Sequence, residues 1–312
     1  MKGSRLLKLL FNPRRILIAI LQTKSFKVLP DKLYVKLLYF FSVGEKLNFN
    51  HLVTYYQKIN WLKFNYKDDL LKICSDKYTV REYIRRKVGD QVLVPLYGIF
   101  TNAKDINFNQ LPDSYILKIT TGNGRNIICE DNGKIDKNKT IKLLNKWLKD
   151  DDYYWRGREW CYKDSNPKII CEKFLNVNGI VPKDYKVYCF HGKPAYIAVF
   201  HDRFGKVPSQ TVYDINWNAL PCVMDYHFKR NINDIEPKPV CYDQILSISE
   251  KVSEAFIHVR VDFYIVNEKP FIGELTFFNA SGCTKMLPQE WDVKIGSLID
   301  LVKISKNGKY IS

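Results

Sequence analysis

Two neighbouring stretches near the C-terminus, residues 259–265 and 272–276, constrain the fold more than any other part of the sequence. Side chains alternate between the two faces of a β-strand, so Arg260 and Asp262 share one face of the first stretch while apolar side chains fill the other. Glu274 occupies a polar position of the second stretch. The stretches therefore predict a strand pair with one polar face, and a connecting loop of odd length would set Asp262 directly opposite Glu274.

Two opposed carboxylates on a buried strand pair repel each other unless a cation lies between them. Oxygen ligands of this kind suit Mg²⁺ or Mn²⁺ that bridges nucleotide phosphates. The alternative is a solvated polar face on which Arg260 neutralises Asp262. The residues alone leave both interpretations open.

Apolar periodicity and turn residues divide the rest of the chain into short elements. Helices are predicted from residue 31, between residues 75 and 89, at 140–149, at 242–256 and near 293–301. Strands are predicted at 92–100, 115–120, 127–129, 168–175, 185–191, 195–201, 210–217, 258–266 and 271–277. The pattern predicts an α+β fold with antiparallel sheets flanked by helices.

Two further segments have the features of a nucleotide site. Residues 117–127 predict a strand, a loop with two glycines and a return strand, in which backbone N–H groups fold over phosphates beside Lys118. This loop has neither the Walker pattern nor the dinucleotide-binding pattern, and an ordinary turn is the alternative. Residues 170–175 predict an apolar strand followed by Asp184, an arrangement that offers backbone groups to adenine and a carboxylate to ribose. A plain edge strand is the alternative there.

The charge of the chain is concentrated at its front. The 312 residues carry a net charge of +16, and residues 1–36 hold nine Lys and Arg side chains against one acid, which is half of that excess. Two apolar runs in the same segment are too short to span a bilayer. We expect residues 1–30 to form a cationic amphipathic segment that lies on the inner face of an anionic membrane. A flexible or partner-packed N-terminal helix is the alternative.

Cysteine, histidine and serine patterns exclude several chemistries. The eight cysteines form no CxxC pair and are expected as thiols of a reducing, cytoplasmic compartment. The five histidines have no zinc-ligand spacing, and no serine lies in a GxSxG motif.

The order of these features resembles the ATP-grasp fold, and more closely the TupA-like ATP-grasp family of bacterial surface-polysaccharide gene clusters. The resemblance extends over about nine-tenths of the chain. The matching segments are residues 31–34, 44–47, 76–83, 117–126, 157–160, 172–173, 184–186, 190–194, 202–203, 260–264 and 273–276.

The resemblance implies a two-lobed architecture. Two α+β lobes with antiparallel sheets would grip ATP, preceded by a helical N-terminal segment. The expected divisions are residues 1–30 for the cationic segment, 31–112 for a helical region and 113–312 for the ATP-grasp domain. Within that domain the small lobe would span about 113–173 and the large lobe about 174–312.

The resemblance also implies site residues. Those expected on ATP are Lys77, Lys118, Gly122, Asn123, Gly124 and Arg125 at the phosphates, Glu172 and Phe174 beside adenine, and Asp184 on the ribose. Those expected on the metal ions are Asp262 and Glu274. Many members carry an Asn two residues after the second carboxylate, where this chain has Thr276, and Asn279 is the nearest substitute. The cations expected to stabilise the transferred phosphoryl group are Lys118, Arg260, Arg203 and Lys186.

The implied reaction is that of an ATP- and Mg²⁺-dependent (or Mn²⁺-dependent) carboxylate-amine ligase. It would join an amino acid to a sugar, most simply a uronic acid of a capsule, O-antigen or teichuronic-type polymer, through an acylphosphate. Arg156, Arg158 and Trp160 lie in an aromatic-rich segment suited to an acidic sugar. A surface loop packed on the second lobe is the alternative for that segment.

Two other function classes match single features of the sequence. A glycosyltransferase would use a DxD-like metal motif, for which residues 150–152 are the candidate, although a solvated charge run at a helix end is the default there. A basic nucleic-acid-binding protein is suggested by the pI of about 9.3. Against it, the basic excess lies in an apolar segment rather than in a recognition helix, so no nucleic-acid partner is expected.

Overall fold

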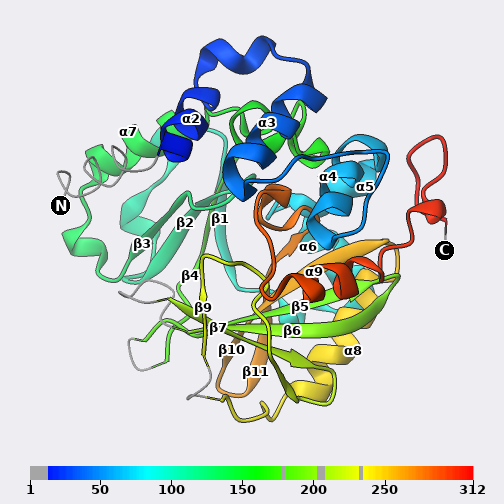
Figure 1. Cartoon of the computed structure of the whole chain (residues 1–312). Coiled ribbons are helices and arrows are strands. Elements are labelled where there is room, and N and C mark those ends of the chain that lie inside the picture. Colours follow the sequence, from blue (N-terminus) through cyan, green and yellow to red (C-terminus); the bar gives the residue numbers. More distant parts are fainter. Residues whose placement is uncertain (1–12, 178–179, 202–207, 232–234, 312) are drawn as a thin grey trace.

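The computed structural model describes residues 13–177, 180–201, 208–231 and 235–311, and two antiparallel sheets dominate it (Figure 1). The described helices are α2 (Pro13–Leu21), α3 (Asp31–Val43), α4 (Tyr55–Asn65), α5 (Asp69–Ser75), α6 (Val80–Val88), α7 (Lys137–Trp147), α8 (Tyr242–Ser253) and α9 (Gln289–Gly296). In these ranges none of the helices reaches the length and apolarity that crossing a bilayer requires.

The smaller sheet has four strands in the order β1-β4-β2-β3. Its strands are β1 (Leu96–Phe100), β2 (Tyr115–Ile119), β3 (Asn126–Cys129) and β4 (Ile169–Lys173). Leu117, Ile119 and Cys171 are fully buried on the face that packs against α7. The opposite face of the sheet is left for Lys118 and Glu172, which have the alternate strand parity.

The larger sheet has seven strands in the order β11-β10-β5-β6-β7-β8, with β9 paired in parallel with β7. Its strands are β5 (Asp184–Phe190), β6 (Lys193–His201), β7 (Ser209–Asp214), β8 (Ala219–Leu220), β9 (Lys229–Arg230), β10 (His258–Val266) and β11 (Lys269–Thr276). Val187, Val261 and Phe263 are fully buried in a core that also takes residues of α4 and α8. The predicted α+β fold is therefore confirmed.

The hairpin of β10 and β11 obtains its register in an unexpected way. The turn has two residues, Asn267 and Glu268, both with positive φ, so the loop is not of odd length. A bulge at Gly273 supplies the one-residue shift, because Phe263 pairs with Ile272 while Asp262 pairs with Glu274. A Cβ at Gly273 would approach the Tyr264 ring to 2.8 Å. The predicted opposition of the two carboxylates is confirmed, but its cause is the bulge.

The front of the chain folds back on itself. Residues 1–12, and with them the first apolar run, lie outside the described residues. From residue 13 onward α2 packs against α3 in a small separate core that includes Leu21, Tyr34 and Leu38. None of the described strand residues contributes to this small core, which therefore lies apart from the cores of the two sheets.

Some predicted boundaries differ from the structure. The last helix spans Gln289–Gly296, earlier than the predicted 293–301. The four-stranded sheet recruits β1, which precedes the expected lobe boundary at residue 113, and the domain boundaries themselves stay predictions. All eight cysteines are free, seven of them buried, in agreement with the expected thiols.

Candidate active site

Three cavities adjoin in a row, from the space between the two sheets to the space between the large sheet and the front helices. The central one, of about 70 Å³, shares Lys118 and Asp184 with an apolar cavity of about 380 Å³. It shares Asn123 and Glu274 with a cavity of about 570 Å³ on its other side. A molecule with an apolar end and a charged end can therefore extend from one cavity into the centre, with a second molecule meeting it from the other side.

The apolar cavity is closed by aliphatic and aromatic side chains from both sheets. Ile116, Phe174 and Phe200 lie in its wall, and Asp184 stands at its junction with the centre. The roles expected for Phe174 beside adenine and for Asp184 on the ribose stay predictions. Glu172 is not in this wall, because its carboxylate turns toward two cations.

Three lysines line the central cavity from different elements. Lys77 precedes α6, Lys118 lies on β2 and Lys186 lies on β5. Lys77 Nζ donates to the carbonyl of Gly122 at 2.6 Å, which ties it to the loop between β2 and β3. Burial lowers the pKa of Lys77, since the protein removes water from the charged form, although Glu274 4.0 Å away acts in the opposite sense.

On the small sheet, Glu172 holds two cations. Lys118 Nζ lies 2.9 Å from one carboxylate oxygen, and Arg81 Nη1 lies 3.1 Å from the other. All three side chains are buried or nearly so. A lysine held in this way is preorganised, because its ammonium is fixed at the cavity wall before any ligand arrives.

On the large sheet, Asp262 binds two further cationic side chains, Arg260 and Lys186. Arg260 forms a bidentate pair with it at 2.6 and 2.7 Å, and Lys186 Nζ lies 2.5 Å away. Burial would raise the pKa of Asp262, but Arg260 and Lys186 outweigh burial and hold it at about 2. The polar face is therefore buried rather than solvated, and protein cations already relieve the repulsion that was expected between Asp262 and Glu274.

The donor set can be tested against Mg²⁺. Asp262 and Glu274 face each other across the strands, and both line the central cavity beside Lys118. Hard carboxylate oxygens of this kind fit Mg²⁺.

Both Asp262 oxygens already accept hydrogen bonds from Arg260 or Lys186, so a metal ion would share this carboxylate with them. Asn279 does not line the central cavity, and its Oδ1 accepts a hydrogen bond from Arg260 Nη1 while its amide donates to Tyr56. In the described part of the chain no group of three or more His, Cys, Asp or Glu side chains is arranged as a metal site.

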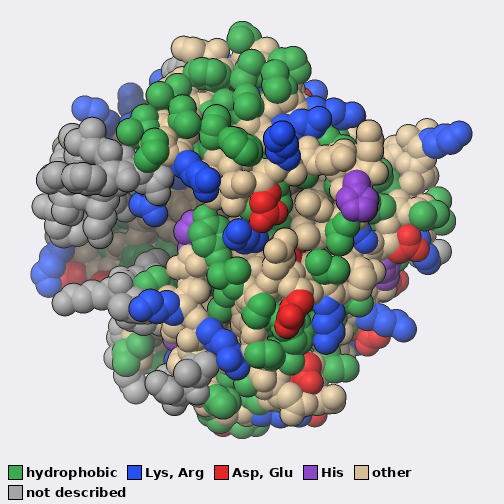
Figure 2. Space-filling view, in the orientation of Figure 1, with side chains coloured by type: hydrophobic (Ala, Val, Ile, Leu, Met, Phe, Trp, Pro, Cys, Tyr) green, Lys and Arg blue, Asp and Glu red, His purple; other side chains and the backbone are tan. Residues whose placement is uncertain are grey.

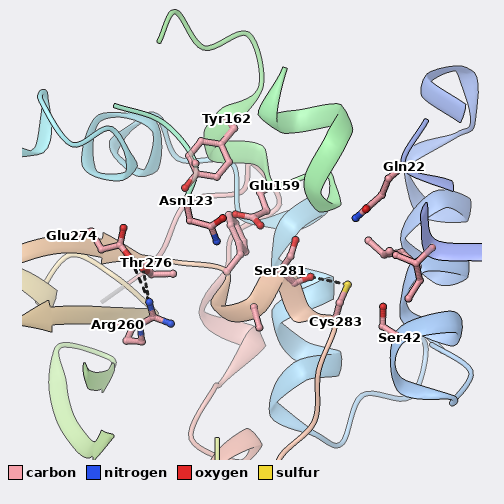
Figure 3. Close-up of a pocket in the computed structure, with 15 residues that line it drawn as sticks. Gln22, Ser42, Asn123, Glu159, Tyr162, Arg260, Glu274, Thr276, Ser281 and Cys283 are labelled. Atoms are coloured by element: carbon pink, nitrogen blue, oxygen red, sulfur yellow. Dashed lines mark hydrogen bonds and ion pairs between the residues drawn. The ribbon is translucent and has the colours of Figure 1, made fainter. Parts of the chain in front are cut away.

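The largest cavity lies between β10–β11 and the helices α2 and α3. Figure 3 shows Gln22 and Ser42 on one side, Arg260, Glu274 and Thr276 on the other, and Glu159 and Ser281 between them. The charged side chains in this wall are Glu159, Glu274 and Arg260, and Arg260 is already paired with Asp262. Glu274 in turn lies 3.5 Å from Arg260 and 4.0 Å from Lys77, so the cavity wall is only weakly acidic and Glu159 is its main carboxylate.

Arg125 is not brought to the cavities. Its guanidinium is buried and contacts the Asp152 carboxylate and the carbonyls of Thr121 and Trp147, at 2.9 Å for Thr121. It fixes the loop between β2 and β3 to the end of α7, while Asn123 and Gly124 face the central cavity. The sequence cannot show this, because Asp152 is remote from the loop along the chain.

The residues proposed for an acidic sugar are also placed elsewhere. Arg158 is fully buried, with Nε 3.2 Å from Asp31 and its guanidinium 4.4 Å from the Tyr34 ring centre. The Trp160 ring packs against lysine side chains, and Lys72 Nζ lies 4.5 Å from the centre of the ring. The side chain of Arg156 and all of Arg203 lie outside the described residues.

Sequence reasoning missed the residues that line the largest cavity. Glu159 and Tyr162 come from the segment that was selected for its arginines, and Ser281 and Cys283 follow Asn279. Ala280 and Ser281 have positive φ, a backbone conformation that no pattern in the sequence announces. The acids at 150–152 are not a metal motif either, because Asp152 is buried against Arg125 and Thr121.

Comparison with solved structures finds several distant similarities. The D-alanine–D-alanine ligase from Bacillus anthracis complexed with ATP is 15% identical over 67% of this chain and 56% of that chain, with a TM-score of 0.40. The corresponding ligase from Helicobacter pylori is 11% identical over 72% and 56%, with a TM-score of 0.38. Phosphoribosylamine–glycine ligase from Thermotoga maritima is 10% identical over 67% and 48%, with a TM-score of 0.39. The chain thus spans about half the length of these structures.

Sequence comparison is more specific. Curated protein sequences give no significant match. The model of the TupA-like ATPgrasp family matches residues 57–300, more than three-quarters of the chain, and this range includes both sheets and all three cavities apart from the α2 and α3 wall. The chain therefore belongs to the TupA-like ATP-grasp family, and ATP with Mg²⁺ is the cofactor pair of such ligases.

Proposed function

We propose that this protein is an ATP- and Mg²⁺-dependent ligase that joins a carboxylate to an amine. The observation that carries the proposal is the order of the three cavities: an apolar one, a central one lined by three lysines and three carboxylates, and a weakly acidic one. ATP would lie with its base in the apolar cavity and its phosphates in the central one. The substrates would meet the terminal phosphate from the acidic side.

In the first step a carboxylate oxygen attacks the terminal phosphorus of ATP, the bond to the bridging oxygen breaks, and ADP leaves. Lys118 and Lys186 supply positive charge on opposite sides of the transferred group, and Arg260 lies at the border with the substrate cavity. Asp262 and Glu274 would hold Mg²⁺, which supplies Lewis-acid stabilisation of the phosphates.

In the second step the amine nitrogen attacks the acyl carbon, the bond to the phosphate oxygen breaks, and inorganic phosphate leaves with the amide formed. An amine nucleophile is cationic until it loses a proton. Glu159 in the wall suits such a group, because a carboxylate attracts an ammonium and accepts its proton. This favours an amine over a second anion as the occupant of that wall.

For the substrates, the family resemblance supports an amino acid as the amine and a uronic acid of a bacterial surface polysaccharide as the carboxylate. The volume of about 570 Å³ is sufficient for an amino acid and one sugar ring together. An enzyme with these substrates acts in the cytoplasm, where ATP is available and where the free thiols agree with a reducing environment.

The proposal is tested by ADP release. Purified protein is incubated with Mg²⁺-ATP, a panel of amino acids and uronic acid glycans, alone and in pairs. We expect ADP release that requires both a carboxylate and an amine, with the amide identified by mass spectrometry. Release of ADP by no pair, together with sugar transfer from a nucleotide sugar, would contradict the proposal.

A further inference from the structure

The outer face of α2 and α3 carries an unusual number of exposed apolar side chains. Leu17, Ile20, Val28, Leu33 and Phe40 are between 41% and 87% exposed, all within the segment from residue 13 to residue 43. Single exposed apolar residues are normal, but a cluster of them marks a contact surface. Figure 2 shows hydrophobic side chains gathered at the top of the view, over these two helices, with Lys and Arg side chains around them.

Helix geometry explains why these side chains are not part of the core. In α3, Leu33, Lys36 and Phe40 have the spacing of one helix face, whereas Tyr34 and Leu38 on the other face are buried. The inner face alone forms the small core with α2. Packing within the protein therefore does not require the outer face to be apolar.

The charge on this segment is strongly one-sided. Residues 13–43 contain six Lys and Arg side chains and one acid, Asp31. Asp31 is engaged by Arg158 and by the Tyr153 hydroxyl, so it does not offset the cations of the outer face. Lys32 and Lys36 are exposed next to Leu33 and Phe40. An apolar surface bordered by lysines matches an anionic lipid surface, whereas a soluble partner would need matching acids and a specific shape.

The same two helices form a wall of the largest cavity. Ile18 from α2, Gln22 just after it, and Leu38 and Ser42 from α3 line it, whereas none of the exposed apolar side chains does. One helix layer, about 10 Å across, therefore separates the outer face from the cavity. A surface that rests on this face lies close to the substrate site.

We propose that the outer face of α2 and α3, defined by Leu17, Ile20, Leu33 and Phe40 together with Val28 from the connection between the helices, lies on an anionic membrane and that the sugar substrate is carried on a lipid. The proposal of membrane binding is argued from the exposed side chains alone, whereas the proposal of a lipid-linked substrate rests on the proposed ligase function. A sugar attached to a lipid headgroup then enters the cavity from the membrane side.

Membrane binding is tested by sedimentation of the full chain with vesicles, without ATP. The probe is vesicles of phosphatidylcholine with about one-third phosphatidylglycerol, compared with pure phosphatidylcholine. We expect wild-type protein to bind the anionic vesicles, with weaker binding at high salt. Leu33→Glu combined with Phe40→Glu should lower the partition coefficient about tenfold or more, because both apolar contacts are lost and two negative charges are added.

The matched control is Val240→Glu combined with Val302→Glu. These valines are 80% and 88% exposed and lie in other segments, so the charge change is the same. The control should bind vesicles within about twofold of wild type. Circular dichroism should show the same helix content in all three proteins. Equal sedimentation of both double variants, or concentration-dependent self-association through this face without vesicle binding, overturns the proposal.

A second measurement separates the lipid-linked substrate from the ligase function. ADP release is compared for a lipid-linked uronic acid in vesicles and for the same sugar in soluble form. We expect about tenfold higher kcat/KM for the lipid-linked form, and Leu33→Glu/Phe40→Glu should remove that advantage while leaving the soluble reaction unchanged. Equal kcat/KM for both forms overturns the lipid-linked substrate, whereas no ADP release with either form contradicts the ligase function itself.

Discussion

The two sheets contain similar ion clusters that are built differently. On the small sheet, Glu172 binds Lys118 from the neighbouring strand and Arg81 from α6. On the large sheet, Asp262 binds Lys186 from the neighbouring strand and Arg260 from its own strand. Each cluster presents a lysine to the central cavity. The central cavity, the proposed phosphate site, is therefore lined by one lysine from each sheet.

The difference lies in how directly each carboxylate is held. Asp262 is in register with Lys186 on one side and with Glu274 on the other. Glu172 is in register with Ile116, so Lys118 reaches it diagonally. Burial lowers the pKa of Arg81, whereas Asp262 raises the pKa of Arg260 well above its usual range despite burial. The large-sheet cluster is the tighter one, and it alone contains residues suited to the metal.

The largest effect should follow from neutralising the centre of each cluster. Asp262→Asn should reduce turnover at least about 1,000-fold, because it removes a metal ligand and the partner of Arg260 and Lys186. It should also lower the free energy of unfolding by about 3 kcal/mol, since two buried cations lose their carboxylate. Glu172→Gln should lower stability by a similar amount but turnover only about 100-fold.

These two variants are measured by ADP release and by urea unfolding. The exposed Glu290→Gln substitution on α9 serves as a matched control, with activity and stability close to wild type. Equal losses of turnover in Asp262→Asn and Glu172→Gln would show that the metal is not held by the large sheet.

The lysines provide the next comparison. Lys118→Met and Lys186→Met should each lower kcat/KM for ATP about 100-fold, because each removes a preorganised cation from the central cavity. If both contact the phosphates, the double variant should lose less than the product of the single losses, since the two positions act on one group. If either variant changes only KM for the amine, that lysine does not contact the phosphates. ADP release at varied ATP gives these constants.

The strand pattern predicts the fold well because it depends on local periodicity. Residues 259–276 place Arg260, Asp262 and Glu274 on one face, and the structure agrees. The bulge at Gly273 was not predictable, because it depends on how the neighbouring Tyr264 ring packs. The placement of Lys118 on a strand also depends only on local periodicity, and the structure has Lys118 on β2 as predicted.

Long-range partners explain where sequence reasoning failed. An arginine near aromatic residues suggested a sugar site, but Arg158 is neutralised by Asp31, 127 positions earlier in the chain. Arg125 likewise pairs with Asp152. Whether a cation is available to a ligand depends on the acid that tertiary folding brings to it, and no local pattern contains that information. Glu159 was overlooked for the same reason, since only folding places it in the cavity wall.

A third buried carboxylate shows what the cations contribute. Asp292 on α9 accepts hydrogen bonds from the backbone N–H groups of Tyr56 and Met286, both at 3.3 Å, and forms no ion pair among the described residues. Burial raises its pKa to about 6, in contrast to about 2 for Asp262. The folded protein therefore keeps a proton on Asp292 that the unfolded chain releases.

The free energy of unfolding should accordingly fall as the pH rises from about 4 to about 6, by about 2 to 3 kcal/mol from this group alone. Asp292→Asn should reduce this slope, measured by urea unfolding at several pH values. Glu290→Gln, at an exposed position of the same helix, should leave the slope unchanged. An unaltered slope in Asp292→Asn would mean that Asp292 is ionised in the folded protein.

The smallest effect on activity is expected from Glu159, in the wall of the largest cavity, the proposed substrate site. Glu159 contributes charge to the acidic wall without being part of either cluster. Glu159→Gln should raise KM for the amine about tenfold, because a carboxylate contact to an ammonium is replaced by a neutral one, and should leave KM for ATP unchanged. The variant should respond less steeply to pH near the pKa of the amine, since the neutral side chain no longer favours the protonated form. A tenfold rise in KM for ATP instead would place Glu159 with the phosphate clusters and not with the nucleophile.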